Sequence, residues 1–161
     1  MKELLDKIAT YNLFNYLFPG VLYSVIINRF TGYSIPLDNL AIGAFICYFI
    51  GLIISRFGSL TIEPILKKIK FVIFSNYGDF VSASKKDPFI ETLSEVNNMY
   101  RTLISMIVLL FLTKLFEIAD KKLFLDPHIK LYLLLAVLLV VFLCSYKKQN
   151  NYIQKRINLN K

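Results

Sequence analysis

Four apolar stretches dominate the sequence, at about residues 13–28, 37–55, 102–118 and 130–146. A bilayer core about 30 Å thick is crossed by roughly 17–25 residues of α-helix, so each stretch is close to the length of one crossing. The fourth stretch has no polar residue between Leu133 and Cys144, whereas a helix at the surface of a soluble protein has polar residues every three or four positions. The pattern therefore predicts an all-α integral membrane protein with four transmembrane helices, and not a soluble four-helix bundle.

Basic residues are distributed unequally between the two sides of such a membrane domain. Of the 19 Lys and Arg residues, 14 fall in the N-terminus, the segment 56–101 and the C-terminal tail, and five fall on the opposite side: Arg29, Lys114, Lys121, Lys122 and Lys130. Cytoplasmic loops of membrane proteins carry the excess of basic residues. We therefore expect a multi-pass protein of the cell inner membrane, with both termini and the segment 56–101 in the cytoplasm.

Length and residue types limit the other possibilities. A chain of 161 residues with four spans has room for a single membrane domain, over residues 1–161. The lone histidine, His128, has no nucleophile or carboxylate cluster beside it, and Cys47 and Cys144 lie within or at the edge of spans. Recognisable hydrolase, protease and metal-binding motifs are missing from the sequence. We expect no enzymatic activity, no cofactor and no metal site.

The segment 56–101 is predicted to contain a cytoplasmic amphipathic helix between the second and third spans. Pro64 suits the first turn of a helix, and Glu63 suits its positive end. Apolar residues and lysines alternate after it, which is typical of a helix that lies on a membrane surface and contacts anionic lipid. A second helix is expected to begin at Pro88, to be capped by Asp87 and to continue unbroken through Ile118.

Six cations of this segment form the candidate ligand-binding site: Lys67, Lys68, Lys70, Lys85, Lys86 and Arg101. Aromatic residues lie among them, and aromatic side chains can stack on nucleic-acid bases while cations attract phosphates. Two interpretations stay open. The cations can bind a nucleotide or oligonucleotide, or they can simply follow from membrane topology and contact anionic lipid.

Polar residues inside the apolar stretches mark a candidate pore, because such residues are costly in a membrane and often line pathways. The first span contains four that we consider together: Asn15, Pro19, Gly20 and Asn28. Pro19 and Gly20 should kink the helix one turn after Asn15. Helix–helix hydrogen bonding by Asn15 is an equally good interpretation. Lys114 and Glu117 are expected to form a local ion pair, and Gly43 and Gly51 are expected to permit close helix contact.

The sequence resembles the membrane channel subunit of Hailong-type bacterial anti-phage defence systems, which is paired with a nucleotidyltransferase. The resemblance rests on NLFNYLFPG at residues 12–20, ISRFGSLTIEP at residues 54–64 and NNMYR at residues 97–101. It implies a homo-oligomeric ion channel, a tetramer as the first expectation, kept closed by an oligonucleotide from the partner enzyme. The alternatives are a non-catalytic accessory or structural subunit of a larger membrane complex, or a holin-like membrane disrupter.

Overall fold

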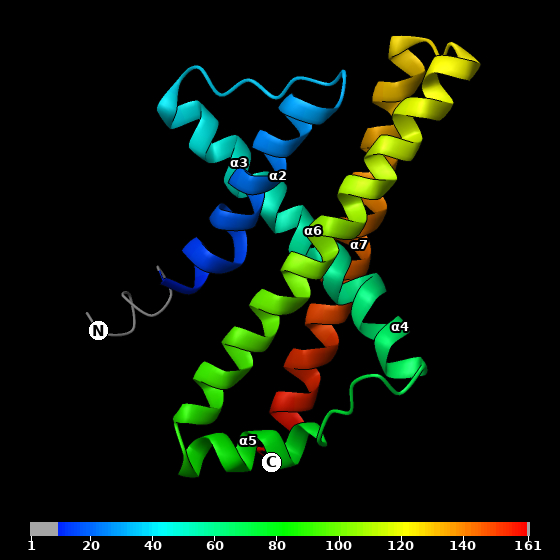
Figure 1. The fold of residues 1–161 in the computed structure, drawn as a ribbon. Coiled ribbons are helices and arrows are strands. Elements are labelled where there is room, and N and C mark those ends of the chain that lie inside the picture. The colour runs from blue at the N-terminus through cyan, green and yellow to red at the C-terminus, as the bar shows by residue number, and fades with distance from the viewer. Residues whose placement is uncertain (1–9, 161) are drawn as a thin grey trace.

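The computed structural model describes residues 10–160, and within that range every regular element is a helix (Figure 1). The elements in chain order are η1 (Leu13–Leu17), α2 (Phe18–Phe30), α3 (Leu40–Phe57), η2 (Gly58–Ile62), α4 (Glu63–Lys68), α5 (Tyr77–Lys86), α6 (Phe89–Leu123) and α7 (Pro127–Asn158). The labels η1 and η2 denote single π-helical turns. The expectation of an all-helical protein is confirmed for this part of the chain.

Three helices of the described chain are long and apolar enough to cross a membrane. They are Leu40–Lys68, Phe89–Leu123 and Pro127–Asn158. The first predicted span, residues 13–28, is not among them: residues 10–30 are helical throughout, but Asn12, Asn15 and Asn28 lower the hydropathy of that helix. The structure therefore supports a membrane-embedded protein with three candidate spans, and four spans are not confirmed.

The helix Leu40–Lys68 differs from our expectation for the segment 56–101. We expected the span to end at residue 55 and a separate amphipathic helix to begin at Pro64, but α3, η2 and α4 form one continuous helix from Leu40 to Lys68. The separate short helix in this segment is α5. The expected second helix does start next to Pro88, where the Asp87 side chain accepts a hydrogen bond from the Phe89 N–H, and α6 runs through the Asn97–Asn98 pair without a break.

Both π-turns directly precede an X-Pro pair, which explains their positions. η1 ends one residue before Phe18-Pro19, and η2 ends one residue before Glu63-Pro64. Proline has no N–H to donate, and its ring clashes with the carbonyl four residues earlier. A π-turn lets the chain continue as a helix while that carbonyl is displaced. The predicted disturbance of the helix near Pro19 is therefore seen as a π-turn.

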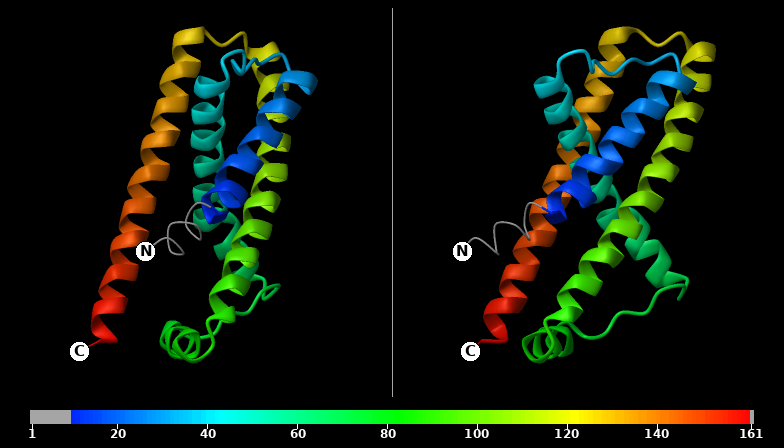
Figure 2. Two further views of the ribbon diagram at one scale, coloured as in Figure 1. Left: turned by 90° about the vertical axis from the view of Figure 1, so that its left-hand side faces the viewer. Right: turned by 60° about the vertical axis from the view of Figure 1, so that its left-hand side comes forward.

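Helix α3 is at the centre of the arrangement and contacts α2, α6 and α7. The consecutive helices α6 and α7 have few contacts with each other, because α7 packs on α3 and η2 instead. Figure 2 shows α6 and α7 separated in both views, and Figure 1 shows α5 lying across the end of the molecule at which the C-terminus lies. We call this end, where α4, α5 and the end of α7 lie, the inner end, and the opposite end the outer end.

Glycines permit the closest helix approach, between the N-terminal helix and α3. A Cβ atom on Gly20 would overlap the Cys47 carbonyl, and one on Gly51 would overlap the Tyr16 carbonyl. The two backbones are therefore in direct contact, as expected for Gly51. Gly43 differs, since a Cβ there would lie 3.4 Å from Leu37 Cα in the preceding loop, so Gly43 serves no helix–helix contact within the protomer.

Two carboxylates of α6 stabilise the outer end through ion pairs and a hydrogen bond. Glu117 pairs with Lys114 at 2.8 Å, as predicted, and also with Lys121 at 2.8 Å, and it accepts the Gly32 N–H at 3.1 Å. Asp120 pairs with Lys130 of α7 at 2.9 Å. These contacts connect the loop after α2, helix α6 and the start of α7, so the outer ends of the helices are positioned relative to one another.

Candidate functional site

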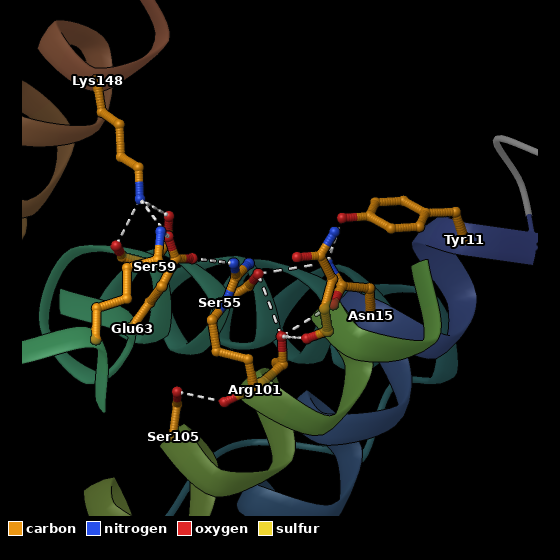
Figure 3. Close-up of polar contacts among 11 residues, drawn as sticks. Tyr11, Asn15, Ser55, Ser59, Glu63, Arg101, Ser105 and Lys148 are labelled. Carbon is orange, nitrogen blue, oxygen red and sulfur yellow. Dashed lines mark hydrogen bonds and ion pairs between the residues drawn. The ribbon is translucent and has the colours of Figure 1, made fainter. Parts of the chain in front are cut away.

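A polar group around Asn15 lies where the N-terminal helix, α3 and α6 meet (Figure 3). The Asn15 amide donates to the Tyr11 hydroxyl at 3.0 Å and to Ser55 Oγ at 3.3 Å, and its oxygen accepts from Thr102 Oγ1 at 2.9 Å. Asn15 is 1% exposed and Thr102 is fully buried. We call these four residues the asparagine cluster. Their hydrogen bonds compensate for the cost of burying polar groups and join three helices.

Tyr11 belongs to this cluster as a neutral hydroxyl. Burial, with a smaller contribution from the neighbouring Tyr16, raises the pKa of Tyr11 to about 12. A phenol with that pKa remains protonated at physiological pH, and its oxygen accepts the Asn15 amide proton.

A second group is built around Glu63, the first residue of α4 (Figure 3). The Glu63 carboxylate lies 2.6 Å from the Arg101 guanidinium, 2.8 Å from Lys67 Nζ and 3.7 Å from Lys148 Nζ. We call these four residues the glutamate cluster. Because Arg101 is on α6 and Lys148 is on α7, one carboxylate connects two helices that otherwise have few contacts.

The local sequence places these groups on one side of the continuous helix. Ser55, Ser59 and Glu63 recur every four residues, so they share a face, and the π-turn η2 lies between the first and the last. Lys148 Nζ donates to both the carbonyl and the hydroxyl of Ser59, each at 2.7 Å. On α6, Arg101 and Thr102 are adjacent, so the two clusters meet there.

Gly58 determines how closely α6 approaches this face. A Cβ atom at Gly58 would overlap Ser105 Oγ, and that hydroxyl donates to the Arg101 carbonyl at 2.6 Å. The absence of a side chain at Gly58 therefore brings the α6 backbone next to η2, where Arg101 reaches Glu63.

Charge is not balanced in the glutamate cluster. Three cations surround one carboxylate, and the buried Nε of Arg101 has no hydrogen-bond partner in the described part of the chain. Removing charges from water is costly unless they are paired. The cluster therefore has a residual positive charge at the inner ends of the candidate spans, and this charge would attract an anion.

The six cations proposed from the sequence are not all brought together in one protomer. Lys67 and Arg101 lie in the glutamate cluster. Lys68 and Lys70, at the end of α4, are exposed, and the structure gives them no ion-pair partner among residues 10–160. Lys85 and Lys86 end α5, and Figure 1 and the right view of Figure 2 place that end away from α4.

The proposed pore residues are engaged within the protomer. Asn15 contacts α3 and α6, as described above, and Pro19 and Gly20 are buried against α3. Asn28 is exposed. Its side-chain oxygen accepts a hydrogen bond from the Ile35 N–H at 2.7 Å, and its side-chain nitrogen donates to the Ile35 carbonyl at 2.9 Å. Of the two interpretations of Asn15, pore lining and helix–helix hydrogen bonding, the second is the one seen within a protomer.

The sequence did not single out several residues of the clusters: Ser55, Thr102 and Lys148, and Glu63 as an ion-pair centre. The spacing of Ser55, Ser59, Glu63 and Lys67 by four residues was the available signal for a polar face on an apolar helix. No local signal connected Glu63 with Lys148.

Comparison with known proteins gives no assignment: no protein-family model, no curated protein and no solved structure matches the chain.

Proposed function

We propose that the protein is a homo-oligomeric membrane effector, an ion channel whose state is set by a phosphate-rich ligand on its inner, cytoplasmic end. The observation that supports it most is the glutamate cluster, in which Glu63 joins Lys67, Arg101 and Lys148 from three helices. An anion that competes for these cations weakens the contacts between α4, α6 and α7. A ligand shifts a gate only by its different affinity for the two states, and helices whose inner ends share one carboxylate provide such a difference.

Assembly from several copies is part of the proposal. Three candidate spans in one protomer are too few to enclose a conduit. No residue of α7, all of which the structure describes, is buried, although the helix is strongly apolar. Apolar helix surface in a membrane faces lipid or further copies, and closed rotational symmetry is the common arrangement of identical copies. The tetramer and the anti-phage role with an oligonucleotide-producing partner enzyme rest on the sequence resemblance alone.

The ligand surface that we propose is the set of cytoplasmic cations Lys67, Lys68, Lys70, Lys85, Lys86 and Arg101. One ligand can contact all six cations only if symmetric assembly brings the end of α5 from one copy toward α4 of another, because a single protomer keeps the two apart. Attraction to phosphates would make ligand binding fall steeply with salt concentration.

Planar-bilayer recordings test this function. Charge reversal with Lys67→Glu and Lys68→Glu is expected to produce leak current and toxicity, because loss of the ligand favours the open state. Lys155→Glu with Arg156→Glu is the matched control, since it changes the charge equally at the inner end of α7, outside the proposed surface. Currents are normalised to the amount of inserted protein.

Two further results distinguish loss of the ligand from damage to the glutamate cluster and from an effect on membrane topology. Lys68→Glu alone changes the proposed ligand surface without removing the Lys67–Glu63 pair, so leak current in this variant argues for ligand loss over damage to the glutamate cluster. Equal loss of insertion in test and control variants, with unchanged conductance per inserted protein, would contradict the proposal. That result is the one expected if the cations serve topology alone or if the protein is an accessory subunit.

A further inference from the structure

A small polar cavity lies between the continuous helix Leu40–Lys68 and α7. Its volume is about 30 Å³, and its lining includes Arg56, Ser59, Ser145, Lys148, Gln149 and Tyr152. This is room for about two water molecules or for the oxygens of one small anionic group. No Asp or Glu side chain is among its lining residues.

The donors around this cavity suit a phosphate. Among residues 10–160, Arg56 donates one hydrogen bond, to the Tyr16 hydroxyl at 3.2 Å, and a guanidinium has five N–H donors, so several have no partner in this part of the chain. Lys148 Nζ donates two hydrogen bonds to Ser59 and lies 3.7 Å from Glu63, so it contributes mainly positive charge beside the cavity, 5.9 Å from the centre of the Tyr152 ring. Two cations with hydroxyl and amide donors are a typical set for binding phosphate oxygens by charge-assisted hydrogen bonds.

The depth of the cavity indicates where that phosphate comes from. In the helix that begins at Leu40, Arg56 is the first charged residue after an uncharged run of residues 40–55. On α7, residues 131–146 are uncharged, and Lys147 and Lys148 follow directly. Both cavity cations therefore lie where an apolar run ends, which is the level of the lipid headgroups when these helices span a bilayer.

From this geometry we infer that the cavity formed by Arg56, Lys148 and Tyr152 binds the phosphate of an anionic phospholipid in the inner leaflet. The acyl chains of the bound lipid extend along the apolar surface of α7. Lys148 also belongs to the glutamate cluster, but Arg56 and Tyr152 lie outside both that cluster and the six cations of the proposed ligand surface. Lipid binding at the cavity does not depend on channel activity.

The test is lipid binding to the purified full-length protein in detergent, measured by native mass spectrometry with phosphatidylglycerol and phosphatidylcholine. The wild type is expected to retain phosphatidylglycerol preferentially. Lys148→Met should weaken its apparent affinity about tenfold, since a hydrogen bond to a charged group contributes about 1.5–3 kcal/mol. Lys147→Met, a neighbour on the same helix outside the cavity, is the matched control and should change the affinity less than twofold.

Lys148 also contacts Ser59 and Glu63, so a second variant separates binding from folding. Tyr152→Phe removes only the hydroxyl of a residue that lines the cavity and keeps the ring that contacts Tyr77, and it should weaken phosphatidylglycerol binding several-fold. Tyr146→Phe, on the same helix outside the cavity, is its control. The thermal transition in phosphatidylcholine alone should be equal for Tyr152→Phe and Tyr146→Phe.

A second experiment, with water-soluble phosphate compounds, shows whether the bound phosphate belongs to a lipid or to a soluble ligand. Adenosine monophosphate and inorganic phosphate should not bind the protein in the absence of anionic lipid, and they should not displace phosphatidylglycerol that the protein has retained. Binding of adenosine monophosphate that Lys148→Met abolishes, without preference for phosphatidylglycerol, would overturn the lipid assignment in favour of a soluble ligand. Equal loss of phosphatidylglycerol in Lys147→Met and Lys148→Met would overturn the site itself, because diffuse positive charge would then explain the binding.

Discussion

At the scale of single residues, a few small side chains determine how the helices approach. Gly20 and Gly51 place the backbone of the N-terminal helix against that of α3, and Ser24, fully buried beside them, donates to the Gly20 carbonyl at 2.8 Å. Asn15 lies one turn away and joins the same helices through its amide. Close backbone approach brings the Asn15 amide within hydrogen-bond distance of Ser55 on α3, whereas the Ser24 hydroxyl is satisfied within its own helix.

We predict that Gly51→Ala and Gly43→Ala have opposite effects on stability. At Gly51 the new methyl group overlaps the Tyr16 carbonyl, so the helices must separate, and the free energy of unfolding should fall by about 1–3 kcal/mol. At Gly43 the methyl group meets Leu37 at 3.4 Å, and the helix gains about 0.5–1 kcal/mol from replacing glycine. Thermal unfolding in detergent measures both. Equal destabilisation by the two substitutions would show that η1 does not pack on α3 in this way.

At the scale of elements, the most informative feature is the end of the continuous helix after Lys68. Lys70 has a φ of 58°, in the left-handed region, and its N–H donates to the Lys67 carbonyl. The Phe71 N–H donates to the Leu66 carbonyl. These two bonds form a Schellman motif, in which glycine usually occupies the left-handed position. A lysine there stores backbone strain at the border of the proposed ligand surface.

Lys70→Gly is therefore expected to stabilise the protein by about 1 kcal/mol, because glycine adopts this conformation without the Cβ penalty. Lys68→Gly is the matched comparison, with the same charge removed two residues earlier, inside the helix. It should destabilise by about 1 kcal/mol. Melting temperatures of the two variants in detergent should shift in opposite directions. A fall in both would mean that the helix does not end in this motif.

At the scale of the whole molecule, the charged groups divide between two ends. The outer end has the contacts of Glu117 and Asp120, and the inner end has the glutamate cluster and helix α5. Helix α5 crosses this inner end, where the Tyr77 ring contacts the Tyr152 ring of α7 (Figure 1). The apolar lengths of the three candidate spans lie between these ends, as a membrane orientation requires.

The excess of basic residues predicts that the inner end is cytoplasmic. Ser84→Cys on α5 and Leu123→Cys at the end of α6 report on the two ends, in a background with the exposed Cys144 replaced by serine. A membrane-impermeant maleimide on intact cells should label position 123 and not position 84. Permeabilised cells serve as the control, in which both positions should react. Labelling at position 84 in intact cells would reverse the orientation.

The sequence by itself determined the features that depend on local pattern. Residues 102–118 and 130–146 fall within α6 and α7, because an apolar run of that length has no other stable environment than a membrane or a large core. Capping by Asp87 and the Lys114–Glu117 pair were also predictable, since both depend on neighbours within one or two turns.

Tertiary structure alone decided the rest. Pro64 suits the start of a helix, yet the π-turn η2 carries the helix through it, and packing of η2 against α6 at Gly58 favours that continuation. Arg101 and Lys148 reach Glu63 from helices α6 and α7, and Thr102 reaches Asn15 from 87 residues away. Such contacts depend on the rotation and height of each helix relative to its neighbours. Those are set by where glycines let backbones approach, and residue spacing along one chain does not encode them.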